Sequence, residues 1–264
     1  MSNAPQRQTD QHFAVTGAGS GIGRAIALRL SSEGARVSLF GRRTEPLAET
    51  RSLAIAAGAD AATLFTARMD VRDDSSVSGA LDSAVSALGP LRGLIANAGI
   101  GGPNFPGDED RFEDLIATNV GGTYRSVRAA QGLLAETGTR HFVLLSSILG
   151  RFGVPWYTGY CTSKTALLGL TRALAMELAD QDIQGNALCP GWVETEMAWE
   201  GIDGMATAMK VTREEALAIA MKEVPMGRMS QPEDIAGLVA FLVSADARGM
   251  TGQGLDMNGG AHMV

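Results

Sequence analysis

Short apolar runs alternate with longer amphipathic runs along most of the chain. The short, β-rich runs predict strands at residues 12–16, 36–40, 62–69, 91–96, 141–146, 183–189 and 253–257. The longer runs predict helices at residues 21–33, 45–57, 75–88, 110–135, 157–179 and 232–244. Apolar strands that alternate with helices are typical of right-handed βαβ crossovers. The pattern therefore predicts an α/β fold, with a doubly wound parallel sheet of about seven strands.

Neither a Pro/Ser-rich linker nor a shift in composition divides the chain. We therefore predict one domain over residues 12–264, preceded by a flexible polar tail at residues 1–11. Residues 194–226 interrupt the alternation with a helix-like stretch that is rich in methionine. Two interpretations stay open for it: a surface excursion that packs its own apolar side chains, or a lid over a substrate pocket.

Composition and charge exclude several classes of protein. The 264 residues are 45% hydrophobic and 19% charged, as is usual for a globular chain. No run approaches the ~18 apolar residues of a membrane span, and the polar start lacks a signal-peptide core. The net charge of -7 argues against nucleic acid as a partner. Two cysteines indicate neither a disulfide framework nor a metal site, and we expect a cytoplasmic protein.

A glycine-rich turn at residues 16–23 follows the first predicted strand and opens the first predicted helix. Glycines in such a turn let backbone N–H groups approach a pyrophosphate at the positive end of the helix. The spacing of Gly17, Gly21 and Gly23 differs from G-x-G-x-x-G, and many glycine turns bind nothing. The strand–turn–helix context favours a dinucleotide site.

The end of the second predicted strand bears on the choice of cofactor. A carboxylate there would bind the adenosine 2′-hydroxyl and repel a 2′-phosphate. The chain instead has Gly41, followed by Arg42 and Arg43, and a guanidinium can bind phosphate through two parallel hydrogen bonds. We predict NADP(H) as the preferred cofactor, mainly through Arg42, with NAD(H) as the second candidate. The alternative is that both arginines are only solvated residues at a helix start.

Tyr160 and Lys164 lie four residues apart in a predicted helix, so their side chains share one face. A free phenol has a pKa near 10 and is a poor acid–base catalyst at neutral pH. A neighbouring ammonium would lower that pKa. Such a pair also occurs by chance in many helices, so its surroundings decide what it means.

Two polar features surround this pair. Ser146 and Ser147 end an apolar strand, where a hydroxyl is well placed to bond a substrate oxygen. Asn119 interrupts the apolar stripe of the predicted helix at residues 110–135. A buried amide has to be hydrogen-bonded. Asn119 is therefore either a structural clamp or part of a proton path to Lys164.

From residue 12 to its end, the chain resembles the short-chain dehydrogenase/reductase family. The matching pieces are TGAGSGIG at 16–23, Asp70-Val71, Asn97-Ala98-Gly99, Asn119, SS at 146–147, YCTSK at 160–164 and PGWVET at 190–195. Each piece is modest alone, but their order and spacing are specific together. The resemblance implies a Rossmann-like sheet of order 3-2-1-4-5-6-7 and a catalytic tetrad of Asn119, Ser147, Tyr160 and Lys164.

The resemblance also implies roles for these residues. Tyr160 would exchange the proton with the carbonyl oxygen, Ser147 would polarise that oxygen, and Lys164 would bind the nicotinamide ribose and lower the tyrosine pKa. Asn119 would hold a water in the proton relay. The implied cofactor contacts, besides Tyr160, Lys164 and the two arginines, are Gly17, Gly19, Ser20, Gly21, Ile22, Gly23, Asp70, Val71, Asn97, Ala98, Gly99, Pro190, Gly191, Val193 and Thr195.

The chain departs from the family pattern in two places. Cys161 stands where the family more often has serine or alanine, and it is either a small packed side chain or a reactive thiol. Ser20 stands where some NADP-binding members carry a basic residue, so the cofactor prediction depends on Gly41 and Arg42. The C-terminal third is similar to 3-oxoacyl-thioester and polyketide ketoreductases and to 3-hydroxybutyrate dehydrogenases. Family members are usually homotetramers.

We therefore predict an NADP(H)-dependent oxidoreductase that transfers a hydride between the cofactor and a ketone or secondary alcohol, either a 3-oxoacyl-type or a cyclic ketone. One alternative is a catalytically silent paralogue that binds dinucleotide as a sensor or scaffold. Another is an epimerase or dehydratase that retains its cofactor, although such chains are generally longer. The sequence does not determine the substrate, the direction or the stereochemistry.

Overall fold

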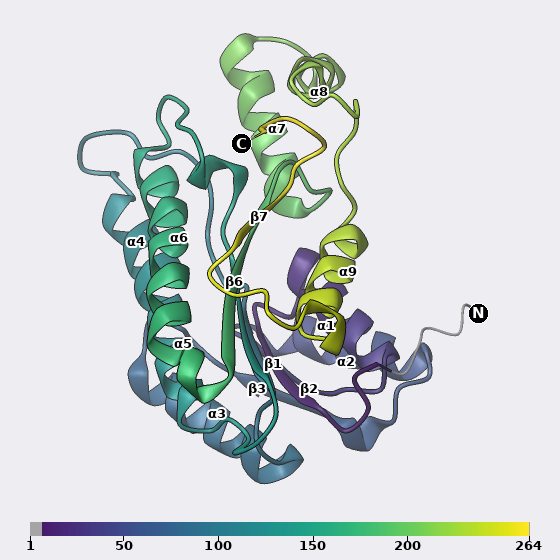
Figure 1. Cartoon of the computed structure of the whole chain (residues 1–264). Coiled ribbons are helices and arrows are strands. Elements are labelled where there is room, and N and C mark those ends of the chain that lie inside the picture. The colour runs from purple at the N-terminus through teal and green to yellow at the C-terminus, as the bar shows by residue number, and fades with distance from the viewer. Residues whose placement is uncertain (1–6, 264) are drawn as a thin grey trace.

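Seven parallel strands form one twisted sheet at the centre of the molecule (Figure 1). The computed structural model describes residues 7–263. The strands are β1 (His12–Thr16), β2 (Arg36–Gly41), β3 (Leu64–Arg68), β4 (Gly93–Ala96), β5 (Arg140–Leu145), β6 (Ile183–Pro190) and β7 (Gly254–Met257). Their order is β3-β2-β1-β4-β5-β6-β7, and every neighbouring pair is parallel. The predicted fold class and strand order are confirmed.

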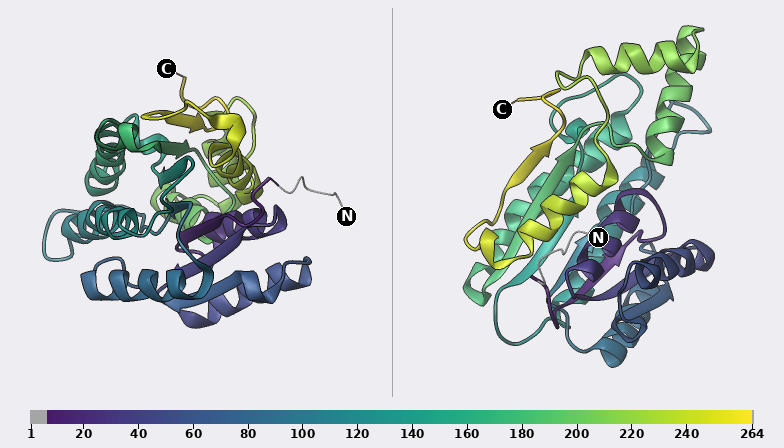
Figure 2. Two further views of the ribbon diagram at one scale, coloured as in Figure 1. Left: turned by 60° about the horizontal axis from the view of Figure 1, so that its bottom comes forward. Right: turned by 90° about the vertical axis from the view of Figure 1, so that its right-hand side faces the viewer.

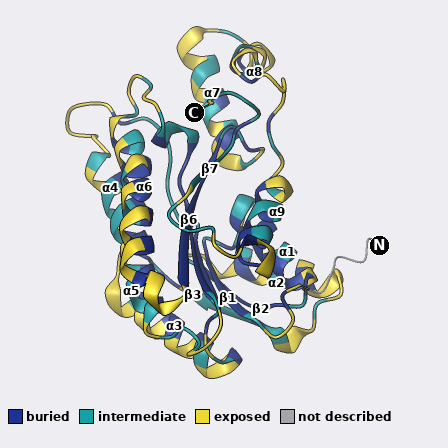
Figure 3. Cartoon of the chain, in the orientation of Figure 1, coloured by how far each residue is buried: buried dark blue, intermediate teal, exposed yellow. Residues whose placement is uncertain are grey.

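Helices cover both faces of the sheet, as the two views of Figure 2 show. Those along the chain are α1 (Gly21–Ser32), α2 (Thr44–Ala56), α3 (Asp74–Leu88), α4 (Phe112–Ile116), α5 (Thr123–Gln131), α6 (Thr158–Leu178), α7 (Glu196–Met209), α8 (Arg213–Lys222) and α9 (Pro232–Leu242). One apolar cluster joins the sheet to α1, α2 and α9, and a second joins it to α3, α5 and α6. The central strands are therefore buried on both sides (Figure 3).

Of the tail predicted at residues 1–11, the structure describes residues 7–11, while residues 1–6 lie outside the described part. Residues 7–10 form a turn in which Gln8 is fully buried. The Gln8 backbone N–H donates to the Glu33 carbonyl at the end of α1, and its side-chain amide donates to the Ala240 carbonyl in α9. These bonds hold Gln8 between α1 and α9, although its side-chain oxygen has no hydrogen-bond partner among residues 7–263, so polarity alone is a poor guide to burial here.

The single helix predicted at residues 110–135 is wrong in its continuity and in its ends. A π-helical segment, Ala117–Gly122, separates α4 from α5, and α5 ends at Gln131. Asn119 lies inside this segment, and its side chain bonds backbone groups of Ile100 outside the helix. π-Helical turns are frequent at functional sites, where they redirect a side chain.

Residues 194–226 lie beyond the carboxyl ends of the strands and contain α7 and α8 (Figure 1). The two helices enclose a small apolar cluster of their own, which includes Ile202, Ala216 and Ala220. Thr195 caps the start of α7, and Thr212 with Glu215 forms a capping box at α8. Within residues 7–263, no helix has the length and apolar character to cross a membrane.

Candidate active site

The glycine turn joins β1 to α1 and leaves no room for side chains. Gly17 has a φ of +68°, and a Cβ added to Gly23 would lie 2.1 Å from the Gly17 carbonyl oxygen. A Cβ cannot lie so close to another heavy atom, and side chains other than glycine rarely adopt a positive φ. Only glycine therefore fits at both positions. Ser20 at the start of α1 makes no side-chain cap, and the first turn of the helix carries no acidic residue. The positive end of α1 is therefore free to face an anion.

Asn97 supports this turn from the end of β4. Its side-chain amide donates to the carbonyls of Thr16 at 3.0 Å and Gly17 at 3.2 Å. The backbone N–H groups of Asn97 and Ala98 donate in turn to the Thr16 hydroxyl. In this structure the Asn97 side chain thus holds the glycine turn, rather than extending into the open cleft beside it.

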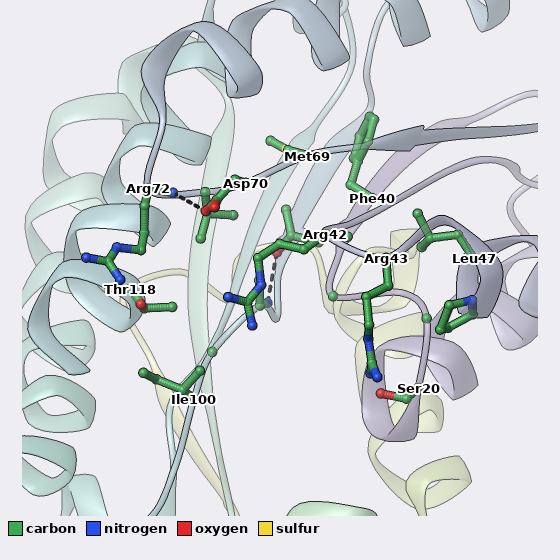
Figure 4. A pocket seen from close by; sticks show the side chains of 18 residues that line it. Ser20, Phe40, Arg42, Arg43, Leu47, Met69, Asp70, Arg72, Ile100 and Thr118 are labelled. Carbon is green, nitrogen blue, oxygen red and sulfur yellow. Dashed lines mark hydrogen bonds between the residues drawn. The ribbon is translucent and has the colours of Figure 1, made fainter. Parts of the chain in front are cut away.

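A cleft opens between the glycine turn and the ends of β2, β3 and β4 (Figure 4). The predicted cofactor residues that line it are Gly17, Gly19, Ser20, Arg42, Arg43, Asp70, Val71, Ala98 and Gly99. The remaining lining residues were not predicted as contacts: Thr16, Phe40, Gly41, Pro46, Leu47, Met69, Arg72, Ile100 and Thr118. The sequence motifs therefore converge on one concave site, as a dinucleotide would need.

Three arginines surround the mouth of the cleft. Figure 4 shows the guanidinium groups of Arg42 and Arg43 beside the cleft, with that of Arg43 directed toward Ser20. Both are exposed, and no ion pair of residues 7–263 engages either of them. Arg72, which the sequence reasoning missed, bonds Asp114 at 3.0 Å. The sequence feature that could have identified Arg72 is its position, two residues after the predicted contact Asp70.

The catalytic candidates meet where β5 ends against α6. The Lys164 ammonium donates to the Leu145 carbonyl at 2.7 Å and lies 5.6 Å from the centroid of the Tyr160 ring. The Ser146 hydroxyl donates to the Lys164 carbonyl at 2.8 Å, which fixes the helix against the strand. Ser147 follows directly and accepts a hydrogen bond from the Leu149 N–H.

Burial controls the protonation of this group. It raises the pKa of Tyr160 to about 12, against a smaller opposing effect of the hydrogen bond with Ser147. It lowers the pKa of Lys164 to about 8. In this structure the Lys164 ammonium bonds the Leu145 carbonyl, and the lowering of the tyrosine pKa by Lys164 stays a prediction. Near neutral pH, the phenol keeps its proton.

The Asn119 side chain makes three hydrogen bonds with its surroundings. Its amide donates to the Ile100 carbonyl at 2.9 Å and to the Ser163 hydroxyl at 3.0 Å, and its oxygen accepts from the Ile100 N–H. A Cβ added to Gly99 would lie 3.1 Å from the Asn119 oxygen and 3.5 Å from the Lys164 ammonium. Gly99, which lines the cleft, therefore also lies beside the side chains of Asn119 and Lys164.

Several predicted cofactor contacts do not line the cleft of Figure 4. They are Gly21, Ile22 and Gly23 of the glycine turn, Asn97, Tyr160 and Lys164, and, at the end of β6 and after it, Pro190, Gly191, Val193 and Thr195. A Cβ added to Gly21 would lie 3.1 Å from the Thr195 methyl group, so the turn after β6 lies against the glycine turn. The Thr195 hydroxyl accepts from the Ala198 N–H and thereby starts α7.

The two cysteines are free, Cys189 buried and Cys161 partly buried. Within residues 7–263, no cluster of three or more histidine, cysteine or acidic side chains is arranged to hold a metal ion. Nothing at the site requires the Cys161 thiol, which lies beside Tyr157 and Tyr160 and contributes to the raised pKa of both phenols.

The chain is similar in sequence to a known protein family and to several characterised reductases and dehydrogenases. The family model described as enoyl-(acyl carrier protein) reductase matches residues 17–262. The 3-oxoacyl-(acyl-carrier-protein) reductase FabG of Staphylococcus aureus is 34% identical, over 94% of this chain and 97% of that one. The 2-(S)-hydroxypropyl-CoM dehydrogenase 3 of Xanthobacter autotrophicus is 34% identical, over 98% of both chains.

A solved structure shows the same fold. A crystal structure of an actinorhodin polyketide ketoreductase variant with NADPH superposes with a TM-score of 0.89, at 35% identity and over 98% of both chains. The family predicted from the motifs is confirmed by these matches. The chain belongs to the short-chain dehydrogenase/reductase family and is an oxidoreductase of C=O and CH–OH groups.

Proposed function

We propose that this chain is an NADP(H)-dependent reductase of ketones, in which Tyr160 donates the proton to the carbonyl oxygen. One observation carries the proposal. The buried Ser147 and Lys164 and the partly buried Tyr160 form a polar group that meets, at Gly99, a cleft with arginines and a glycine turn. A proton donor and a dinucleotide site are thereby brought to one place.

The residues of the cleft fit NADP(H). The glycine turn and the uncapped start of α1 suit the pyrophosphate. Gly41 brings no carboxylate to the end of β2, while Arg42 and Arg43 supply exposed guanidinium groups for a 2′-phosphate. When bound, the nicotinamide supplies or accepts the hydride. The relative crystallised with NADPH supports this choice over NAD(H).

The proton chemistry belongs to the chain's own residues. With a pKa near 12, the Tyr160 phenol is protonated at neutral pH and can donate to an oxygen that gains negative charge. The Ser147 hydroxyl, at the end of β5, would bond the same oxygen and orient the carbonyl. Lys164 would lie beside the cofactor ribose, and Asn119 holds Ile100 and Ser163 in place around them.

For the substrate, we propose a 3-oxoacyl-type or cyclic ketone, bound under the segment of residues 194–226 acting as a lid. The FabG and polyketide ketoreductase relatives support the class. The position of α7 and α8 beyond the carboxyl ends of the strands supports the lid. We further propose a cytoplasmic homotetramer, on the family resemblance.

The test is a panel of β-ketoacyl thioesters, cyclic ketones and secondary alcohols, each assayed with both cofactors. We expect turnover of at least one ketone, with NADPH used better than NADH. Tight NADPH binding without turnover on any member would instead support a silent dinucleotide-binding paralogue. A clear preference for NADH would contradict the proposed role of Arg42.

A further inference from the structure

A buried amide stands in an otherwise exposed loop near the catalytic helix. The loop between β4 and α4 contains exposed residues such as Phe105 and Asp108, yet Asn104 is only 5% exposed. A polar side chain that is buried among exposed neighbours needs partners close by. The family motifs do not include this residue, and the site described above does not use it.

The partners of Asn104 lie at the start of α6. Its side-chain oxygen accepts from the Gly159 N–H at 2.8 Å, and its amide nitrogen lies 3.0 Å from the Thr158 hydroxyl. Its own backbone N–H donates to the Trp156 carbonyl at 2.8 Å. Three neighbouring residues of one turn are thus bound by a single residue from a distant loop.

This contact replaces a missing helix cap. The residue that precedes α6, Tyr157, makes no side-chain hydrogen bond to the first turn. The first N–H groups of a helix have no partner within the helix. Asn104 supplies the acceptor for Gly159 through space, as an N-cap asparagine does within its own chain segment.

The same amide ties the loop to α4. Its nitrogen donates to the Asp110 carboxylate at 3.0 Å, and that carboxylate accepts from the Phe112 N–H at the start of α4. A Cβ added to Gly159 would lie 2.8 Å from the Leu115 side chain of α4. The starts of α4 and α6 are therefore in close contact, with Asn104 bonded to both.

Tyr160 directly follows Gly159, whose backbone N–H donates to the Asn104 side chain. Farther along α6, Ser163 is bonded to Asn119, and Lys164 is bonded to Leu145 and Ser146. These bonds fix the helix on the far side of Tyr160. Asn104 fixes the near side, so the phenol is held between two anchors.

We infer that Asn104 is a positioning residue of the reductase site, which holds the first turn of α6 and thereby places the Tyr160 hydroxyl for proton donation. This role rests on the proposed function, since it concerns Tyr160 as the proton donor. A displacement of about 1 Å can cost on the order of 100-fold in rate. Asn104 does not line the cleft, so cofactor binding should not depend on it.

The experiment compares Asn104→Ala with wild-type protein and with Asp108→Ala, an exposed change in the same loop. We expect kcat for ketone reduction to fall by about 10- to 100-fold in Asn104→Ala. KM and the NADPH Kd should change little, and Asp108→Ala should resemble wild type. A kcat that stays within a factor of two of wild type would overturn the inference.

A second pair of variants separates positioning from a general loss of folding. Asn104→Asp keeps the acceptor for Gly159 but sets a carboxylate against Asp110. Adding Asp110→Asn restores one donor and one acceptor with their places exchanged. We expect the single variant to lose kcat and the double variant to recover most of it; failure of recovery in a folded double variant would contradict the inference.

Hydrogen exchange gives a readout that needs no turnover. In Asn104→Ala, the amides of residues 158–162 should exchange faster, while those of α1 should be unchanged. If wild type reduces no ketone, the proposed function fails, and this measurement still tests the anchoring of α6. Unchanged exchange at residues 158–162 would overturn the inference whether or not the wild type is active.

Discussion

The two ends of the sheet contain similar polar residues but use them differently. At the carboxyl ends of the strands, Arg42 and Arg43 are exposed and take part in no ion pair among residues 7–263. At the amino ends, Arg36 donates to the Leu88 carbonyl at 2.7 Å and Arg92 donates to the Thr137 carbonyl at 2.8 Å. The guanidinium groups of Arg42 and Arg43 therefore remain available to a ligand, whereas those of Arg36 and Arg92 are bound to the backbone.

The buried titratable groups show the same contrast. Lys164, whose ammonium lies 5.6 Å from the centroid of the Tyr160 ring, is close to Gly99, which lines a cleft that a ligand can enter. His12, at the amino end of β1, lies between the Gly89 carbonyl, to which its Nδ1 donates, and the Ser38 hydroxyl. In the neutral form of His12, both ring nitrogens therefore have hydrogen-bond partners within the protein. Changes at the carboxyl ends should therefore alter activity, and changes at the amino ends should alter stability.

Tyr160→Phe should have the largest effect. Without the hydroxyl no proton reaches the carbonyl oxygen, and general acid catalysis contributes about 10²- to 10⁴-fold. We expect kcat to fall by that factor while the NADPH Kd and the melting temperature change little. Retention of wild-type activity by the variant would remove the basis of the proposed mechanism.

A fall in pH should test the residues at the amino ends of the strands. Burial lowers the pKa of His12 and of His141 from 6.5 to about 4. Below pH 6.5 the unfolded chain binds protons that the folded protein does not, so stability that is present above 6.5 is lost as the pH falls toward 4. Each of the two histidines should contribute a drop of about 3 kcal/mol in the free energy of unfolding over this window, measured by urea titration.

His141→Leu is the matched variant for that measurement. The Nδ1 of His141 has no hydrogen-bond partner among residues 7–263, so the change removes a titrating group without breaking a bond at that atom. The loss of stability between pH 6.5 and 4 should shrink, and kcat at neutral pH should stay unchanged. An acid dependence identical to that of wild type would show that other groups cause it.

Arg42→Ala should weaken NADPH without affecting NADH. A charge-assisted hydrogen bond to phosphate is worth about 1.5–3 kcal/mol, or roughly a 10- to 100-fold change in Kd. The same substitution at Arg43 should give a smaller change, since Arg42 follows Gly41 directly. Equal effects on the two cofactors, measured by fluorescence titration, would contradict the assignment of Arg42 to the 2′-phosphate.

The smallest effect concerns the alkaline limb of the pH profile. Lys164 is charged below its pKa of about 8 and neutral above it, whereas Tyr160 remains protonated up to about 12. For ketone reduction, kcat/KM should therefore be level up to about pH 8 and then decline by up to tenfold per pH unit. A profile that stays level to pH 10 would show that the charge of Lys164 is not needed.

The elements that sequence reasoning located well are those with a strong periodic signal. Each strand could be placed to within two residues at both ends. The signal is strongest for β1, β4, β5 and β6, which are fully buried runs, whereas β3 and β7 at the edges of the sheet are only partly buried. Asn104 could not be found this way, since it lies in an irregular loop and its partners Thr158 and Gly159 in α6 are more than fifty positions away. The burial of Gln8 could not be predicted for the same reason, because its side chain bonds the Ala240 carbonyl, which is far away in the sequence.

The motifs located the cofactor cleft and the group around Tyr160, but they did not fix the state of that group. Proximity in sequence suggested that Lys164 tunes the phenol, whereas the actual partner of the ammonium, Leu145, is set by how α6 packs on β5. Likewise, apolar periodicity is nearly the same for an α-helix and for one with a π turn. Local hydrogen-bond choices of this kind depend on tertiary contacts.

The π-helical segment at Ala117–Gly122 has a consequence for changes in chain length. A π turn contains about one residue more than an α turn, so deletion of a single residue there would let one regular helix run through. The segment would still complete the same rotation, so Val127 and Ala130 farther along the helix would stay buried against the sheet. A one-residue deletion in the regular part of the helix, before these two residues, would instead rotate them by about 100° and turn them away from the sheet. This helix should therefore accept the loss of one residue within Ala117–Gly122 far better than elsewhere.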